Sequence, residues 1–210
     1  FSKLPSEKSM RKSFPTRLLL RKDCLMKGTE AFQELLPLLG DEPVVHANGF
    51  ICRESFSIKD REENFYMIGS MGLASSIGLG VALCKPDRKV IVLDGDGNVL
   101  MSMGTLAMIS AEAPNNLVHV VIDNEVYEST GKQRSISNAV PLEQVAKSAG
   151  YRQAVRVDKK EAIKPAFEKL MNSEGPVFLL IKVEPCFDSK TGRVTHTPEE
   201  ITERFMKSLR

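Results

Sequence analysis

Two apolar segments rich in β-branched residues, at 88–94 and 117–123, most constrain what this chain can fold into. The first leads into Gly95-Asp96-Gly97, the second ends in Asp123-Asn124, and the stretch between them, at about 98–112, is typical of a helix. Strands separated by helices of this length pair in parallel through right-handed crossovers. The sequence therefore predicts two parallel strands whose polar carboxyl ends meet at one edge of a sheet.

The rest of the chain continues the same alternation. We expect further strands at 43–47, 151–157 and 177–183, helices at 23–39, 71–84, 142–149 and 159–171, a helix start at Thr197-Pro198, and a charged loop at 50–66. This pattern predicts an α/β fold of three layers, an open and mainly parallel sheet with helices on both faces.

Charge is distributed unevenly along the chain. Residues 1–30 contain eight Lys and Arg against three Asp and Glu, whereas the remainder contains 21 against 24. We therefore expect a basic tail at 1–20, either a mobile extension or a targeting peptide, one domain at 21–190, and a C-terminal extension with a short helix at 191–210. Because the body of the chain is not basic, we expect no nucleic-acid partner.

Neither the cysteines nor the longest uncharged segment indicates a special environment. The four cysteines are far apart and include no CxxC pair, which favours a reducing, cytoplasmic location without zinc or disulfides. Residues 67–84 are uncharged over 18 positions, but they include four glycines and three serines. We expect a buried helix there and no membrane span.

Asp96 and Asn124 are the strongest candidates for a binding site. Asp-Gly at the end of a strand is usually only a turn. Here, however, Asn124 ends the next strand, 28 residues later, and ligands of parallel sheets bind at that edge. Carboxylate and carboxamide oxygens suit a divalent cation that carries a diphosphate. The pair Asn115-Asn116 precedes its strand, so we expect it at the opposite edge.

A second candidate is Gly69-Ser70-Met71-Gly72, at the expected start of the helix that follows. Exposed N–H groups at a helix N-terminus favour phosphate. Alternatively, the glycines in and after this segment let the helix approach the sheet closely. The two interpretations are compatible.

Four segments carry a resemblance to a known family: VVHANGFICRESF, NFYMIGSMGLASSIGLG, LDGDGNVLMSMGTLA and IDNEVYESTGKQ. Across residues 21–185 the chain resembles the diphosphate-binding domain of thiamine-diphosphate-dependent 2-oxoacid decarboxylases. Within that class it is most similar to the sulfopyruvate decarboxylase β subunits and the phosphonopyruvate decarboxylases. It departs from the usual pattern at Asp123, where the family commonly has Asn, and at His46-Ala47-Asn48, where we associate phosphonopyruvate decarboxylase with Thr-Thr-Gly.

The resemblance implies a role for each matching residue. It implies Mg²⁺ bound by the side chains of Asp96 and Asn124 and the carbonyl of Val126. It implies that Met71 lies between the two rings of thiamine diphosphate and that the Gly69 carbonyl, beside Ser70, accepts a hydrogen bond from the aminopyrimidine. The implied contacts with the diphosphate are Asn48, Gly49, Gly95, Gly97 and Asn98.

The resemblance also implies an activity and a partner. The implied reaction is the decarboxylation of sulfopyruvate to sulfoacetaldehyde, as in coenzyme M biosynthesis. The activating glutamate of this family belongs to a pyrimidine-binding domain, and since no segment here corresponds to it, we expect an α subunit as partner. Lys132 and Arg134 are candidates for binding the anionic 2-oxoacid. The alternatives are a half-enzyme of the phosphonopyruvate decarboxylase type and a non-catalytic metal- or nucleotide-binding module.

Overall fold

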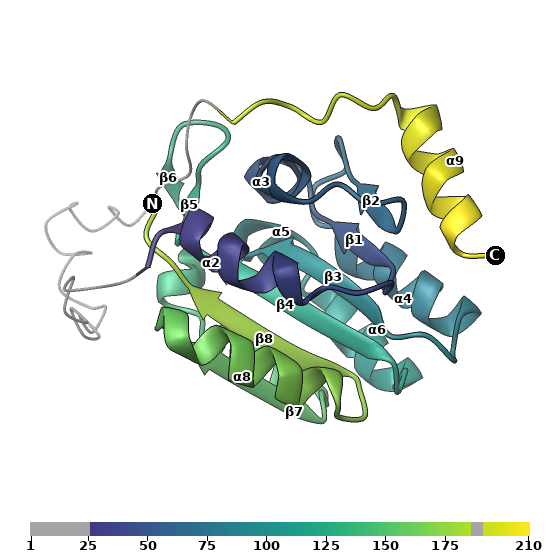
Figure 1. The fold of residues 1–210 in the computed structure, drawn as a ribbon. Helices are drawn as coiled ribbons and strands as arrows, with labels where there is room; N and C mark the ends of the chain where they lie inside the picture. Colours follow the sequence, from purple (N-terminus) through teal and green to yellow (C-terminus); the bar gives the residue numbers. More distant parts are fainter. Residues whose placement is uncertain (1–25, 186–190) are drawn as a thin grey trace, which may run out of the picture.

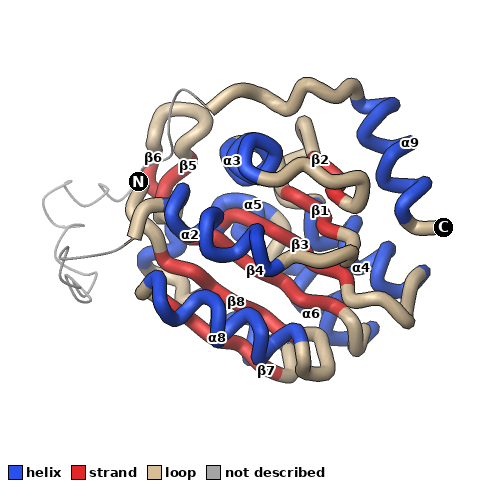
Figure 2. The backbone as a smooth tube through the Cα atoms, in the orientation of Figure 1, coloured by secondary structure: helices blue, strands red, loops and turns tan. Residues whose placement is uncertain are grey.

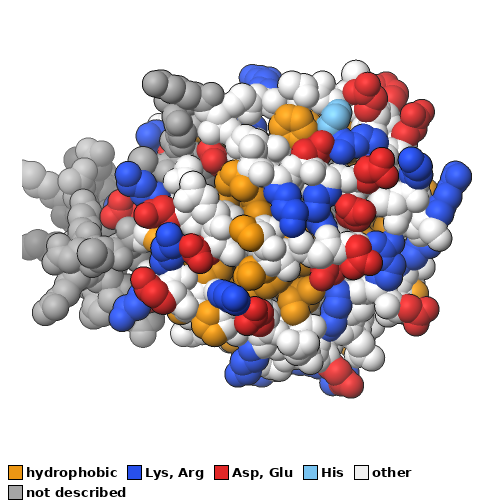
Figure 3. Space-filling model, in the orientation of Figure 1, with side chains coloured by type: hydrophobic (Ala, Val, Ile, Leu, Met, Phe, Trp, Pro, Cys, Tyr) orange, Lys and Arg blue, Asp and Glu red, His pale blue; other side chains and the backbone are white. Residues whose placement is uncertain are grey.

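The structure is a computed structural model that describes residues 26–185 and 191–210. The predictions for the tail at 1–20, for Cys24 and for Cys186 lie outside these residues. Basic and acidic side chains are interspersed over the face shown in Figure 3, and neither charge gathers there in one large patch.

Six parallel strands form one sheet, with the strand order β2-β1-β3-β4-β8-β7 (Figure 1). Their bounds are Val44–His46 (β1), Asn64–Tyr66 (β2), Val90–Gly95 (β3), Leu117–Asp123 (β4), Gln153–Val157 (β7) and Val177–Lys182 (β8). A separate antiparallel ribbon pairs β5 (Val126–Tyr127) with β6 (Gln133–Arg134). Every residue of β3, β4 and β8 is buried, as expected of central strands covered on both faces.

Helices cover both faces of the sheet (Figure 2). On one face α2 (Gly28–Leu35) contacts both α3 (Phe50–Ile58) and α8 (Lys160–Met171). On the other face α4 (Ala74–Cys84), α6 (Gly104–Glu112) and α7 (Leu142–Ala149) lie in a row. The remaining elements are α5 (Asp96–Met101), α9 (Pro198–Ser208) beside β2, and the 3-10 helices η1 (Leu36–Leu38) and η2 (Ile136–Asn138). The predicted three-layer α/β fold is confirmed.

The prediction of a loop at 50–66 is wrong. This segment contains α3 and the edge strand β2. The buried residues of α3 are Ile51, Cys52, Glu54 and Ser55, so half of its buried side is polar and its apolar stripe is short. A helix of nine residues with so short an apolar stripe is stabilised mainly by the sheet it packs on, which a local pattern does not reveal.

Two predicted helices have different bounds in the structure. The stretch at 98–112 is divided at Ser102 into α5 and α6, and α5 begins at Asp96 itself. The helix expected from 71 begins at Ala74, because Ser70 and Gly72 have φ of 54° and 92°. These left-handed angles are incompatible with an α-helix. Residues 69–72 therefore form a turn before the helix.

The apolar segment 67–84 contributes only α4, of 11 residues, to the helices. In the described parts of the chain, every helix is too short or too polar to cross a bilayer.

Gly78 lets α4 approach β3 closely, as the sequence predicted for these glycines. A Cβ atom at Gly78 would lie 2.1 Å from Cγ2 of Val92, whereas a Cβ atom at Gly80 would meet nothing within 4 Å. We expect Gly78→Ala to lower the free energy of unfolding by about 1–3 kcal/mol through overpacking. The matched variant Gly80→Ala is expected to raise it by up to about 1 kcal/mol through helix propensity. Denaturant unfolding of the two variants measures both effects, and equal values would contradict this explanation.

Candidate functional site

The carboxyl ends of β1, β3 and β4 lie side by side in the middle of the sheet. The chain crosses from β1 outward to β2 and from β3 outward to β4, in opposite directions. The crevice between β1 and β3 is therefore a topological switch point, where open α/β sheets bind their ligands. A pocket opens at this edge.

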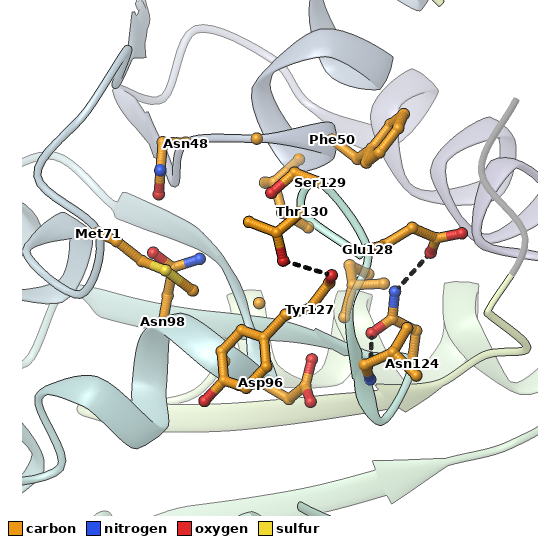
Figure 4. Close-up of a pocket in the computed structure, with 16 residues that line it drawn as sticks. Asn48, Phe50, Met71, Asp96, Asn98, Asn124, Tyr127, Glu128, Ser129 and Thr130 are labelled. Atoms are coloured by element: carbon orange, nitrogen blue, oxygen red, sulfur yellow. Dashed lines mark hydrogen bonds between the residues drawn. The ribbon is translucent and has the colours of Figure 1, made fainter. Parts of the chain in front are cut away.

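The pocket collects residues from the ends of all three strands (Figure 4). Nine of the eleven residues predicted to contact a cofactor line it: Asn48, Gly49, Met71, Gly95, Asp96, Gly97, Asn98, Asn124 and Val126. The other two, Gly69 and Ser70, line a neighbouring hollow between the segment 65–73 and α9. The consecutive residues Ser70 and Met71 therefore line different hollows. Tyr127, Glu128, Ser129 and Thr130 also line the pocket, and the sequence did not single them out.

Asp96 is buried at the start of α5, with 3% of its surface exposed. Its Oδ2 accepts hydrogen bonds from the hydroxyls of Ser135 and Ser137, the latter at 3.0 Å. Burial, and after it the nearby charge of Asp123, raise the pKa of Asp96 to about 6, although the hydrogen bonds from the two serines act to lower it. Because ionisation of Asp96 is unfavourable here, a bound cation would stabilise its charged form.

Asn124 has a defined amide orientation. Its Nδ2 donates to Oε2 of Glu128 at 2.8 Å, and its Oδ1 accepts from the backbone N–H of Val126 at 3.1 Å. Because a carboxylate only accepts and an N–H only donates, these contacts together identify which atom of the amide is oxygen.

Asp123 belongs to an ion pair behind the pocket. Lys182, at the end of β8, places Nζ 2.9 Å from Oδ2 of Asp123 and 2.6 Å from Oε1 of Glu125. Lys182 contacts two carboxylates, and Asp96 adds a third close to Asp123. Asp96 and Asp123 are both buried, and the excess of negative charge around them favours a bound cation. Sequence reasoning missed Lys182, Ser135 and Ser137, for which no local motif gives a signal.

The residues present suit a cofactor with phosphates and a cation. Oδ1 of Asn48 is buried at the pocket without a hydrogen-bond partner, so this amide has capacity for a bound group. Gly97 is tightly enclosed, because a Cβ atom there would lie 2.6 Å from the ring of Tyr127 and 3.2 Å from Cε of Met71. Gly49 has a φ of 85°, which favours glycine.

The two candidate substrate residues lie outside the pocket lining. Lys132 is on the turn between β5 and β6, with its side chain 66% exposed and Nζ 3.6 Å from Oε1 of Glu128. Arg134 is exposed on β6. The structure does not bring either into the pocket, although Glu128 links Lys132 to Asn124.

Comparisons with known proteins identify the family of the chain. Residues 55–181 match the family model of the thiamine pyrophosphate enzyme, C-terminal TPP binding domain. The chain is 40% identical over 186 residues to the sulfopyruvate decarboxylase subunit beta of Methanothermobacter thermautotrophicus, covering 89% of this chain and 97% of that one. It is 43% identical over 171 residues to the phosphonopyruvate decarboxylase of Streptomyces viridochromogenes, covering 81% of this chain but only 43% of that one.

The fold has known counterparts as well. The benzoylformate decarboxylase of Polynucleobacter necessarius superposes on 77% of this chain and 34% of that one, with a TM-score of 0.64 and 15% identity. A likeness at this identity concerns the fold alone. The chain spans less than half the length of the phosphonopyruvate decarboxylases it matches and nearly all of the sulfopyruvate decarboxylase β subunits. From the family match and these identities, the chain belongs to the thiamine pyrophosphate enzymes and contains their C-terminal TPP binding domain.

Proposed function

We propose that this chain is the diphosphate-binding β subunit of a thiamine-diphosphate- and Mg²⁺-dependent 2-oxoacid decarboxylase, acting on sulfopyruvate. The observation that carries the proposal is the single pocket at the carboxyl ends of β1, β3 and β4, which brings together Asn48, Asp96 and Asn124. The relatives named above support the reaction class. A cytoplasmic location is part of the same proposal.

In this proposal the chain binds Mg²⁺ through the side chains of Asp96 and Asn124 and the carbonyl of Val126. The diphosphate lies against Gly95, Gly97 and Asn98, and against Asn48 and Gly49 on the other side. Met71 supports the bent cofactor, while the Gly69 carbonyl, next to Ser70, meets the aminopyrimidine from the neighbouring hollow. When bound, thiamine diphosphate supplies the nucleophilic carbon and the electron sink for loss of CO2. The described residues bind it, orient it and compensate its charge.

The proposal includes a second subunit. Cofactor activation requires a glutamate on the pyrimidine, and we propose that it comes from a pyrimidine-binding α subunit. Met71 lies in a part of the pocket away from Glu128 (Figure 4), and Glu128 is engaged by Asn124 and Lys132. In this proposal the active assembly is a heteromer of the two subunits.

The substrate is a small 2-oxoacid with a second anionic group. Lys132 and Arg134 lie on the β5–β6 ribbon, next to the pocket residues Tyr127 to Thr130. We propose that they contribute positive charge at its rim, where a sulfonate or phosphonate would lie. Phosphonopyruvate is the second candidate, favoured by the 43% identity to a phosphonopyruvate decarboxylase.

A substrate panel tests the proposal. The full-length protein that carries this chain, with any subunit that co-purifies, is assayed for CO2 release from sulfopyruvate, phosphonopyruvate and pyruvate. We expect the highest kcat/KM with sulfopyruvate and the lowest with pyruvate. Lys132→Ala with Arg134→Ala is expected to raise KM for the dianionic substrate with little change for pyruvate. Absence of decarboxylation with all three acids would refute the proposal, and a preference for phosphonopyruvate would select the second candidate.

A further inference from the structure

Both ends of the loop 124–138 lie beside the proposed cation site. It begins at Asn124, carries Val126 on β5, turns back through β6 and ends in η2. Near its end, the backbone N–H of Ser135 donates to the carbonyl of Glu125 at 2.9 Å. The beginning and the end of the loop are therefore held together.

Ser137, near the end of this loop, contacts three buried polar side chains. Its hydroxyl lies 3.0 Å from Oδ2 of Asp96, 2.8 Å from Oδ1 of Asp123 and 2.9 Å from the hydroxyl of Ser135. All four side chains are buried, with exposed fractions between 2% and 6%. Ser137 thus joins a proposed ligand to the residue that immediately precedes the other ligand.

The hydroxyl of Ser137 has one hydrogen and two carboxylate neighbours. It can donate to Asp96 or to Asp123, but not to both at once. Ser135 donates to the same oxygen of Asp96, Oδ2. Both contacts hold one side of the carboxylate, which leaves Oδ1 as the oxygen for a ligand in the pocket. Neither serine lines the pocket, so neither is placed to touch the cofactor directly.

We propose that Ser137 is a positioning residue of the cation site, whose hydroxyl orients Asp96 and ties it to the loop that carries Asn124 and Val126. This inference rests on the proposed function, because it concerns the cation of that same site. Residues that orient metal ligands by hydrogen bonds commonly contribute 10–100-fold to metal affinity. The consequence is that cation binding and the order of the loop 124–138 depend on each other.

The test compares variants that separate the hydroxyl from the volume of the side chain. Calorimetry measures Mg²⁺ binding to the full-length protein, with co-purifying subunits, in saturating thiamine diphosphate. We expect Ser137→Ala and the near-isosteric Ser137→Cys to weaken Mg²⁺ binding about tenfold or more, and Ser137→Thr to recover to within about threefold of the wild type. Ser110→Ala is the matched control. Ser110 is on α6, and its buried hydroxyl has no hydrogen-bond partner, so its removal should leave the Mg²⁺ affinity unchanged.

Hydrogen exchange provides a readout besides affinity. In the wild type, Mg²⁺ with thiamine diphosphate should slow exchange of the amides in 124–138, and in the Cys variant this protection should be smaller at equal cation saturation. Wild-type Mg²⁺ affinity in the Cys variant overturns the inference while leaving the proposed function intact. So does a Thr variant as weak as Ala with a wild-type unfolding midpoint. If the wild type binds neither thiamine diphosphate nor Mg²⁺, the proposed function itself fails.

Discussion

Asp96→Asn is expected to weaken binding of Mg²⁺ and thiamine diphosphate by more than about 100-fold, since it removes the one charged ligand of the proposed site. The substitution keeps the size of the side chain, and the amide oxygen can still accept from Ser135 and Ser137. A general loss of structure is therefore not expected. Calorimetry with thiamine diphosphate and Mg²⁺ measures the effect, and Asp158→Asn, an exposed aspartate after β7, is the matched control. Binding that survives Asp96→Asn would favour a module in which Gly95-Asp96-Gly97 only turns the strand.

The same variant is expected to be more stable than the wild type when metal is absent. The pKa of Asp96 is raised from 3.8 to about 6 in the folded chain, so the fold holds this proton more tightly than the unfolded chain does. Stability from the protonated form is present at low pH and is lost as the pH rises from about 4 through about 6. At pH 8 the ionised carboxylate costs up to about 3 kcal/mol, which Asp96→Asn recovers. Denaturant unfolding at pH 5 and pH 8 should show a pH-dependent gap between variant and wild type in EDTA, and a constant gap would contradict this assignment.

The chain alone is expected to show no decarboxylation, and activity should appear when the pyrimidine-binding partner is added. Among the described residues that line the pocket, Glu128 is the single glutamate. We do not expect Glu128 to activate the pyrimidine of the cofactor, because its carboxylate accepts a hydrogen bond from Asn124 and lies 3.6 Å from Nζ of Lys132. We therefore expect the activating glutamate to come from the partner. We expect the rate of CO2 release to differ by several orders of magnitude between the chain alone and the chain with its partner. The detection limit for CO2 sets the largest difference that can be measured.

The measurement uses the purified chain, shown to be free of other subunits, with and without the partner. Glu128→Gln in the reconstituted assembly is the control, since it keeps the hydrogen bond from Asn124. We expect this variant to retain activity. Full activity of the chain alone, abolished by Glu128→Gln, would show that the chain activates the cofactor itself.

Much of the fold could be predicted because its signal is local. The apolar runs of β3, β4 and β8 are long and uninterrupted, and α7 and α8 have distinct apolar stripes. The segment 50–66 could not be predicted in this way. Its strand, β2, has only three residues, and α3 is held by packing on β1 and β3. Short elements of this kind depend on the sheet next to them.

The site divides in the same way. Asn48, Asp96 and Asn124 follow strands, and parallel pairing brings the ends of neighbouring strands to one edge, so their convergence followed from order along the chain. The displacement of Gly69 and Ser70 into the adjoining hollow did not follow, because it results from the left-handed turn at Ser70 and Gly72.

The amino-acid sequence by itself determined the parallel sheet, the edge at which the candidate site residues meet, and the family, because apolar periodicity and strand-end residues are properties of short segments. Only the tertiary structure decided what surrounds those residues. Ser137 meets Asp96 across 41 positions and Lys182 meets Asp123 across 59. Contacts at such separations arise only when the strands and helices pack, and no local pattern encodes which side chains will then face each other.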